Sequence, residues 1–180
     1  MKPRLIAVST IALLVLLIAG TSMAWFSSED SQDGEFKLGT VKVEVVEEGF
    51  TDVEGATATT YEKNAQVKSL GTKKTYVRVR LVPEWSNPSL PVSNVELNLA
   101  LNDDWLLVDG HYYFKYYLTQ NQISSLLLES VTFTELGEEY EGEIFKLHVI
   151  AEGVQITHQA WKDVWGIDSL PFTPNQPWDL

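Results

Sequence analysis

Few side chains in this 180-residue sequence could carry out catalysis or bind a metal ion. There is no cysteine, which excludes thiol catalysis and thiolate metal ligands. The three histidines, His111, His148 and His158, do not form the His-Glu-x-x-His motif of zinc peptidases. An extended strand through His148 and His158 would separate them by about 33 Å, so they share a metal only if the chain folds back. The sequence therefore predicts no catalytic residues, no metal site and no enzymatic activity.

Calcium is the one cofactor for which the sequence offers any case. Residues 29–34 are acidic and end in glycine, but Thr40 stands where a calcium-binding EF-hand loop needs its bidentate glutamate. The acidic pairs Asp103-Asp104 and Glu138-Glu139 suit either calcium ligands or a solvated surface. We predict no required cofactor and keep calcium as the alternative.

The N-terminus carries the pattern that a signal peptidase recognises. Lys2 and Arg4 form a basic start, residues 5–19 are apolar apart from one serine and one threonine, and Ser22 and Ala24 place small residues at the cleavage positions. The pattern predicts a signal peptide over residues 1–24, cleaved after Ala24. The chain would then be secreted, to the extracellular matrix or the cell surface, and would touch the membrane only through the uncleaved peptide.

An uncleaved membrane anchor is the alternative for this segment. A helix over residues 5–20 would be about 24 Å long, shorter than the hydrocarbon core of about 30 Å. Extending that helix through Trp25 and Phe26 would give it enough length to span a bilayer.

The charge of the chain disfavours anionic partners. Its net charge is −12, and removing residues 1–24 takes away two of the 13 basic residues and none of the 25 acidic ones, which leaves −14. Such a surface repels phosphate backbones, so we expect no nucleic acid partner. Without cysteine no disulfide can stabilise the exported protein, and its stability must come from a hydrophobic core.

Alternating apolar and polar residues predict strands through most of the chain. The alternation is clearest in residues 41–45, 76–82 and 95–101, and Pro83 is expected to end the second of these. Residues 131–134 and 144–156 are predicted as further strands, and residues 51–64 and 86–91 as loops. Asp109-Gly110, between residues 105–108 and 112–115, predicts a β-hairpin with a tight turn.

One short helix is predicted near the C-terminus, over residues 157–165, capped by Thr157 and ended by Gly166. These elements predict an all-β, jelly-roll-like β-sandwich, preceded by the signal-peptide helix. We expect a signal peptide over residues 1–24, an N-terminal lead and possible donor strand over 25–37, and a single β-sandwich domain over 38–180.

The aromatic residues 112–117 have two interpretations. Tyr112, Tyr113, Phe114, Tyr116 and Tyr117 could form a platform that binds carbohydrate. Alternating aromatic residues in a strand more often pack in the core or pair across strands.

Several segments, in order along the chain, resemble the TasA/camelysin group of Gram-positive surface and biofilm-matrix proteins, which are exported through the SipW-type signal peptidase. The junction at residues 20–27 is similar to that group's cleavage site, and Phe36-Lys37-Leu38-Gly39-Thr40 is similar to the start of its first strand. The segments Val77-Arg78-Val79-Arg80, Asp109-Gly110 with Tyr112-Tyr113, and Ala151-Glu152-Gly153-Val154-Gln155 match further motifs of the group. The resemblance spans residues 20 to about 165.

The resemblance implies a jelly-roll domain that polymerises outside the cell by giving its N-terminal segment to a neighbouring copy. Carried onto this sequence, the donor residues are Trp25, Phe26, Phe36 and Leu38. Residues 27–35 are more acidic than a typical donor segment, which leaves open which strand is given. The implied partners are other copies of the chain and a SipW-type signal peptidase.

Physical chemistry supports the same expectation, because an extended peptide added to an open sheet edge gains main-chain hydrogen bonds. Two alternatives remain. The first is a monomeric surface adhesion or carbohydrate-binding module, and the second is a camelysin-like surface peptidase.

Overall fold

The structure, a computed structural model, describes residues 39–179, which lie within one compact unit, Leu38–Leu180. The predicted signal peptide and the whole of the predicted lead lie outside the described residues. Within residues 39–179, no helix has both the length and the apolar character needed to cross a membrane.

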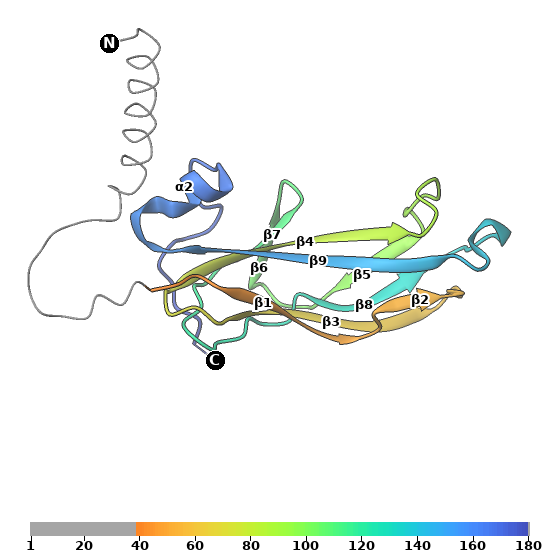
Figure 1. The fold of residues 1–180 in the computed structure, drawn as a ribbon, viewed down its shortest axis with the longest axis horizontal. Coiled ribbons are helices and arrows are strands. Elements are labelled where there is room, and N and C mark those ends of the chain that lie inside the picture. The colour runs from red at the N-terminus through yellow and green to blue at the C-terminus, as the bar shows by residue number, and fades with distance from the viewer. Residues whose placement is uncertain (1–38, 180) are drawn as a thin grey trace, which may run out of the picture. The chain divides into compact units, whose positions relative to one another are not determined.

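Two antiparallel sheets make up the domain (Figure 1). The order in the first is β1 (Val43–Gly49), β3 (Thr60–Ser69), β8 (Leu128–Phe133) and β5 (Val95–Leu99). The order in the second is β2 (Asp52–Glu54), β9 (Ile144–Gln155), β4 (Thr75–Trp85), β7 (His111–Phe114) and β6 (Trp105–Val108). Apart from the β6–β7 hairpin, each strand is followed by one in the other sheet, as in a jelly roll. The predicted all-β sandwich is therefore confirmed.

Two clusters of buried side chains fill the space between the sheets. One is built around Trp85, Phe133 and Phe145, whose rings lie about edge-on or tilted to one another with centroids 4.8 to 5.6 Å apart. The other contains Val67, Val79 and Phe114. This burial of aromatic rings provides the core that a chain without disulfides requires.

A third cluster lies on the outer face of the second sheet. The helix α2 (Ala160–Trp165) covers this face, and its Trp165 packs with Tyr76 and Tyr113. Both faces of β4 are therefore buried near its start, which explains why Tyr76 and Arg78, predicted opposite the valines of the strand, are also buried.

The prediction that Pro83 ends its strand is wrong, because β4 continues to Trp85. Pro83 lies opposite Leu147 of β9. The carbonyl of Ile144 and the N–H of Ile156 form hydrogen bonds with the β4 segment, so even-numbered residues here face β4 and Leu147 faces away from it. Backbone groups alternate in direction along a strand. The nitrogen of Pro83 therefore points away from β9, toward the side where β7 pairs only with Arg78 and Val79. Its missing N–H leaves no partner unbonded.

Residues 51–64 are not one loop, so this prediction is also wrong. The short strand β2 lies within them, and β3 begins at Thr60. The inward positions of β3 are occupied by Tyr61 and then by Lys63, which is only 4% exposed. A lysine at an inward position hides the alternation of apolar and polar residues that marks the rest of β3.

The hairpin prediction is confirmed. Val108 of β6 lies opposite His111 of β7, and Asp109 and Gly110 have φ values of 49° and 75°. Positive φ at both central residues is what a tight turn of type I′ requires.

The helix prediction is confirmed at its end and wrong at its start. Gly166 has φ 67° and its N–H donates to the carbonyl of Lys162 at 3.1 Å. Thr157 does not cap the helix, because it begins a 3₁₀ turn, η2 (Thr157–Gln159), and α2 starts only at Ala160. His158 and Gln159 take left-handed conformations and so interrupt a continuous helix over residues 157–165.

The C-terminal residues form a strap that ends in a buried tryptophan. The indole N–H of Trp178 donates to the carbonyl of Ile123 at 2.9 Å, and its ring lies 5.0 Å from that of Phe114. The backbone N–H of Asn175 donates to the hydroxyl of Tyr76 at 2.7 Å. The strap thus connects the core between the sheets with the outer cluster.

We predict that Trp178→Ala lowers the free energy of unfolding by about 3 to 4 kcal/mol, because it removes a buried ring and a hydrogen bond. Urea denaturation followed by tryptophan fluorescence measures the change. Val164→Ala, at a position 62% exposed, is the control and should change stability by less than about 0.5 kcal/mol. Equal stability of the two variants would show that the strap does not stabilise the domain.

Candidate functional site

The residues predicted from the sequence to act in export and assembly are Ser22, Ala24, Trp25, Phe26, Phe36 and Leu38, and all of them lie outside the described residues. The structure therefore describes only surfaces that could receive them. The chain enters the described domain at Gly39 and Thr40, where the N–H of Thr40 donates to the hydroxyl of Thr72 at 3.0 Å.

The aromatic residues 112–117 are packed in the protein. Tyr113 and Phe114 are 3% and 0% exposed, and Tyr112, Tyr116 and Tyr117 are half-buried against the hydrophobic clusters. The core interpretation of this stretch is confirmed, and it offers no open platform for a carbohydrate.

The histidines and acidic pairs are dispersed. The Nε2 of His148 lies 2.8 Å from a carboxylate oxygen of Glu84, while the Nδ1 of His111 lies 3.2 Å from the carbonyl of Asp109. His158 is exposed. Within the described part of the chain, no group of three or more histidine, aspartate or glutamate side chains is arranged to hold a metal ion.

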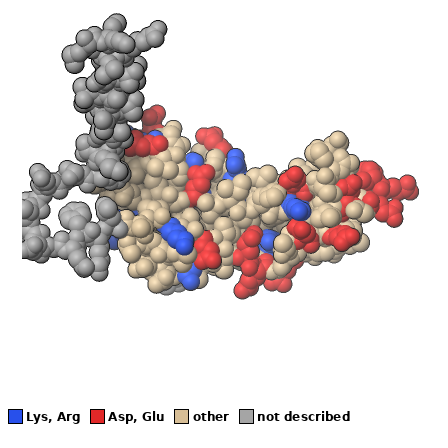
Figure 2. All heavy atoms as spheres, viewed as in Figure 1, with Lys and Arg blue, Asp and Glu red and all other residues tan. Residues whose placement is uncertain are grey.

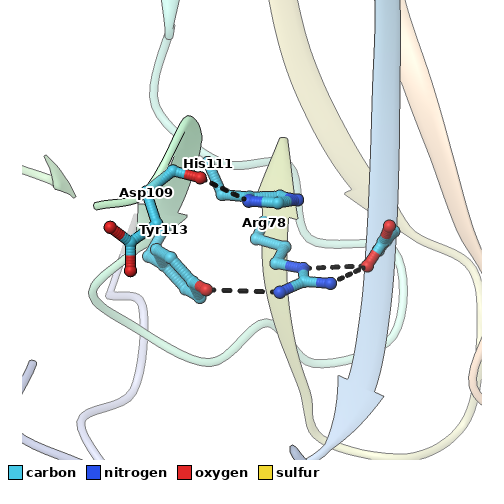
Figure 3. Close-up of polar contacts among 5 residues, drawn as sticks. Arg78, Asp109, His111 and Tyr113 are labelled. Atoms are coloured by element: carbon cyan, nitrogen blue, oxygen red, sulfur yellow. Dashed lines mark hydrogen bonds and ion pairs between the residues drawn. The ribbon is translucent and has the colours of Figure 1, made fainter. Parts of the chain in front are cut away.

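A polar network that joins three strands of the second sheet is centred on Arg78 of β4 (Figure 3). Its Nε and Nη2 lie 2.8 and 2.7 Å from one carboxylate oxygen of Glu152, and its Nη1 donates to the hydroxyl of Tyr113 at 3.2 Å. The guanidinium carbon of Arg78 also lies 4.9 Å from the ring centroid of Trp165. This paired charge connects β4, β7, β9 and α2.

A long stretch of β9 has no partner strand on one side. β4 pairs with β9 from Phe145 to Gln155, but β2 pairs on the other side with only three of its 12 residues, Ile144, Phe145 and Lys146. This leaves nine residues, 147–155, unpaired on that side within the described domain. We call this side of residues 147–155 the β9 edge.

The direction of the backbone groups at this edge follows from the bonds to β4. The carbonyl of Ile144 and the N–H of Ile156 bond toward the β4 side, so even-numbered residues of β9 face β4. The backbone groups of Leu147, Val149, Ala151 and Gly153 therefore point to the β9 edge. Unpaired backbone groups of this kind are a template for another strand.

The same odd-numbered residues direct their side chains to the interior. Leu147 is 7% exposed, while Val149 and Ala151 are half-buried against the core clusters. At Gly153 the two sheets approach closely, since a methyl group there would lie 2.7 Å from Cγ1 of Val43. The space beside the edge therefore narrows toward Gly153.

At the other end of the β9 edge lies a cavity of about 550 Å³, which we call the Phe50 cavity. It is lined by the end of β1, the connection from β1 to β2, and neighbouring residues of β2, β3 and β9: Glu47, Glu48, Gly49, Phe50, Thr51, Asp52, Lys63, Lys146, Leu147 and His148. The buried Nζ of Lys63 donates to the carbonyl of Phe50 at 2.7 Å and lies 3.2 Å from a carboxylate oxygen of Glu47. The Nζ of Lys146 lies 3.7 Å from a carboxylate oxygen of Asp52, so the cavity combines an aromatic ring with two cations whose charges are compensated.

The other sheet edges are shorter or carry more charge. β6 and β5 have four and five residues, and the pairing of β5 with β8 shifts between Asn98 and Leu99. β1 has exposed glutamates at positions 44, 47 and 48. Short length and charged side chains are features that protect the edges of natural sheets from further pairing. The β9 edge is the longest unpaired edge in residues 39–179.

No protein-family model matches the chain, and neither curated proteins nor solved structures give a match.

We predict that Arg78→Met destabilises the domain by about 2 kcal/mol, because Glu152 and the hydroxyl of Tyr113 lose a charged donor. Arg80→Met, two residues along the same face but exposed, should change stability by less than about 0.5 kcal/mol. Urea unfolding of both variants measures the difference, and an unaffected Arg78→Met would show that the network contributes little.

Proposed function

We propose that this chain is an extracellular structural protein, the subunit of a biofilm-matrix or cell-surface filament. After signal cleavage, the freed N-terminal segment of one subunit adds as a strand to the next subunit, and repetition of this contact gives a head-to-tail filament. The observation that carries the proposal is the β9 edge, a sheet edge of nine residues with no partner within the described domain.

The energetics of strand addition support this assignment. A buried backbone N–H or C=O without a partner is unfavourable, and each hydrogen bond formed contributes about 0.5 to 1.5 kcal/mol. The odd-numbered residues of the β9 edge offer a series of backbone groups with no strand partner on that side within the described domain. The candidate donor segment contributes Trp25, Phe26, Phe36 and Leu38, whose burial adds to the hydrogen bonds.

A filament also follows from the nature of such a contact. The donor segment and the acceptor edge are different parts of the surface, so the contact is heterologous and need not close into a ring. Before cleavage, the signal peptide holds the donor segment at the membrane, which would delay assembly until export. The resemblance to the TasA/camelysin group supports the same function.

The partners implied are other copies of this chain and a SipW-type signal peptidase, with no nucleic acid and no required cofactor. We propose no enzymatic role, because no residue pattern in the sequence supports one. Burial of the aromatic residues 112–117 gives a monomeric carbohydrate-binding module less support than the filament.

We predict that deleting residues 25–36 abolishes polymer and leaves a folded monomer. The deletion removes the donor segment but none of the described residues. Negative-stain electron microscopy and sedimentation of the protein starting at Trp25, at several concentrations, provide the reference, and circular dichroism checks the fold of the deletion variant. Normal fibres from the deletion variant, or only monomers from the reference protein at every concentration, would contradict the proposed function.

A further inference from the structure

We propose that lysines at one end of the domain bind an acidic loop at the opposite end of a second copy. The lysines are Lys42, Lys73 and Lys74, which we call the lysine cluster. The acidic loop is residues 135–143, between β8 and β9. This inference rests on the proposed filament function, and it adds a contact between neighbouring subunits that the ends of the domain make through their side chains.

The lysine cluster is a local excess of positive charge in an acidic chain. Residues 67–77 contain three lysines and no acidic residue, although the whole chain has 25 acidic and only 13 basic residues. The N–H of Lys73 donates to the carbonyl of Thr40 at 3.1 Å, which brings the connection from β3 to β4 beside Lys42. All three lysines of the cluster are exposed. They therefore present three cations on one end of the domain.

The acidic loop places the opposite charge beside a cavity. The loop contains no lysine or arginine, and its exposed carboxylates are those of Glu135, Glu138, Glu139 and Glu141. Acidic side chains gather at this end of the domain in Figure 2. A cavity of about 360 Å³ lies between the loop and residues 55–57, and Glu138 and Glu141 are part of its lining. A lysine side chain that entered this cavity would meet carboxylates.

Neither set of charges is compensated by ion pairs within the described domain. The ion pairs among residues 39–179 involve neither the lysine cluster nor the acidic loop. The Nζ of Lys74 lies 4.9 Å from the ring centroid of Tyr117, which is a neutral neighbour. Both sets of charges are thus available to a partner of opposite charge.

The two ends cannot meet within one copy. β9 begins directly after the acidic loop, at Ile144, and ends at Gln155, which lies opposite Thr75, the residue after Lys74. A strand of 12 residues separates the two ends by about 36 Å, and Figure 1 shows them at opposite ends of the sandwich. The lysine cluster therefore reaches an acidic loop only in another copy. Because the two surfaces differ, the contact is heterologous and can repeat without closing.

Complementary charge of this kind determines the orientation and the rate of association more than the affinity. Exposed ion pairs are individually weak, and the net charge of −14 expected for the mature chain still repels other copies. We expect the contact to favour head-to-tail approach over every other arrangement of two acidic domains. Gly39, where the described chain begins, lies beside Lys73, so the candidate donor segment leaves the domain at the same end.

A charge exchange tests the contact in fibre formation by chains starting at Trp25. Two triple variants are made, A with Lys42→Glu, Lys73→Glu and Lys74→Glu, and B with Glu138→Lys, Glu139→Lys and Glu141→Lys. We expect A and B alone to elongate several-fold more slowly than the parent, because each lacks one of the two opposite charges. An equimolar mixture of A and B, and a chain carrying all six substitutions, should recover the parent rate. Circular dichroism verifies that each variant is folded.

Variant B separates a specific contact from general repulsion. B is less acidic than the parent, so repulsion alone predicts that B assembles faster, whereas the proposed contact predicts that it assembles more slowly. Elongation of B at or above the parent rate would overturn the inference. Failure of both the mixture and the sixfold variant to recover the parent rate would also overturn it.

Disulfide trapping tests the same contact without requiring fibres, because the chain has no cysteine. Thr40→Cys, next to the lysine cluster, is mixed under mild oxidation with Ala58→Cys, next to the cavity. We expect disulfide-linked pairs of chains to form several-fold faster than in a mixture of Thr40→Cys with Leu107→Cys, an exposed position on β6. Equal rates in the two mixtures would show that these ends do not bind each other and would overturn the inference.

The two experiments distinguish failure of the inference from failure of the proposed function. Trapped pairs at residues 40 and 58 without fibres from the parent chain would support the contact and contradict the filament. Fibres from the parent chain without preferential trapping at these residues would support the filament and overturn the contact.

Discussion

The pairing of β4 with β9 is the interaction on which the rest of the domain depends. It runs through 11 opposed residue pairs, from Thr75 with Gln155 to Trp85 with Phe145. β7 attaches to the other side of β4, β2 to the beginning of β9, and α2 follows the end of β9. Backbone groups in a protein interior need hydrogen-bond partners, and this pair satisfies one side of β4 and one side of β9. The unsatisfied side of β9 is what makes the domain a candidate for addition of a further strand.

The outer face of the second sheet shows why the aromatic residues are not a binding platform. α2 and the C-terminal strap lie over its half near the start of β4, and Arg78 is buried there with its charge compensated by Glu152. A buried charge that lost this partner would be strongly unfavourable. The aromatic residues Tyr76, Tyr113 and Trp165 therefore serve to hold α2 in place around this ion pair.

The sequence was sufficient for the fold where local chemistry determines the structure. The Asp109-Gly110 turn and the Gly166 helix end require positive φ values that few other residues accept, and the alternation in β4 reflects burial of one face between the sheets. It was insufficient where tertiary contacts determine it. Lys63 is inward because Glu47 and the carbonyl of Phe50 compensate its charge, and Pro83 is tolerated because β7 pairs with only part of β4.

The candidate acceptor was unpredictable for the same reason. Nothing in residues 144–155 distinguishes the three that pair with β2 from the nine that do not, because the difference lies in where the β1–β2 connection crosses between the sheets. The donor residues, by contrast, were proposed from sequence motifs alone, and the described part of the chain does not contain them. An open edge is defined by what the rest of the fold leaves unpaired, which a linear pattern does not encode.

Charge limits how copies of such a domain can meet. The mature chain would carry a net charge of −14, and acidic side chains gather at the end of the domain where β8 connects to β9 (Figure 2). Copies therefore repel one another at long range, although salt at physiological strength confines this repulsion to about 8 Å. Association then requires short-range gains that outweigh the repulsion, and a strand inserted along an edge supplies them through hydrogen bonds and buried rings. Near the Phe50 cavity, Lys63 and Lys146 offset part of the acidic charge through their pairs with Glu47 and Asp52.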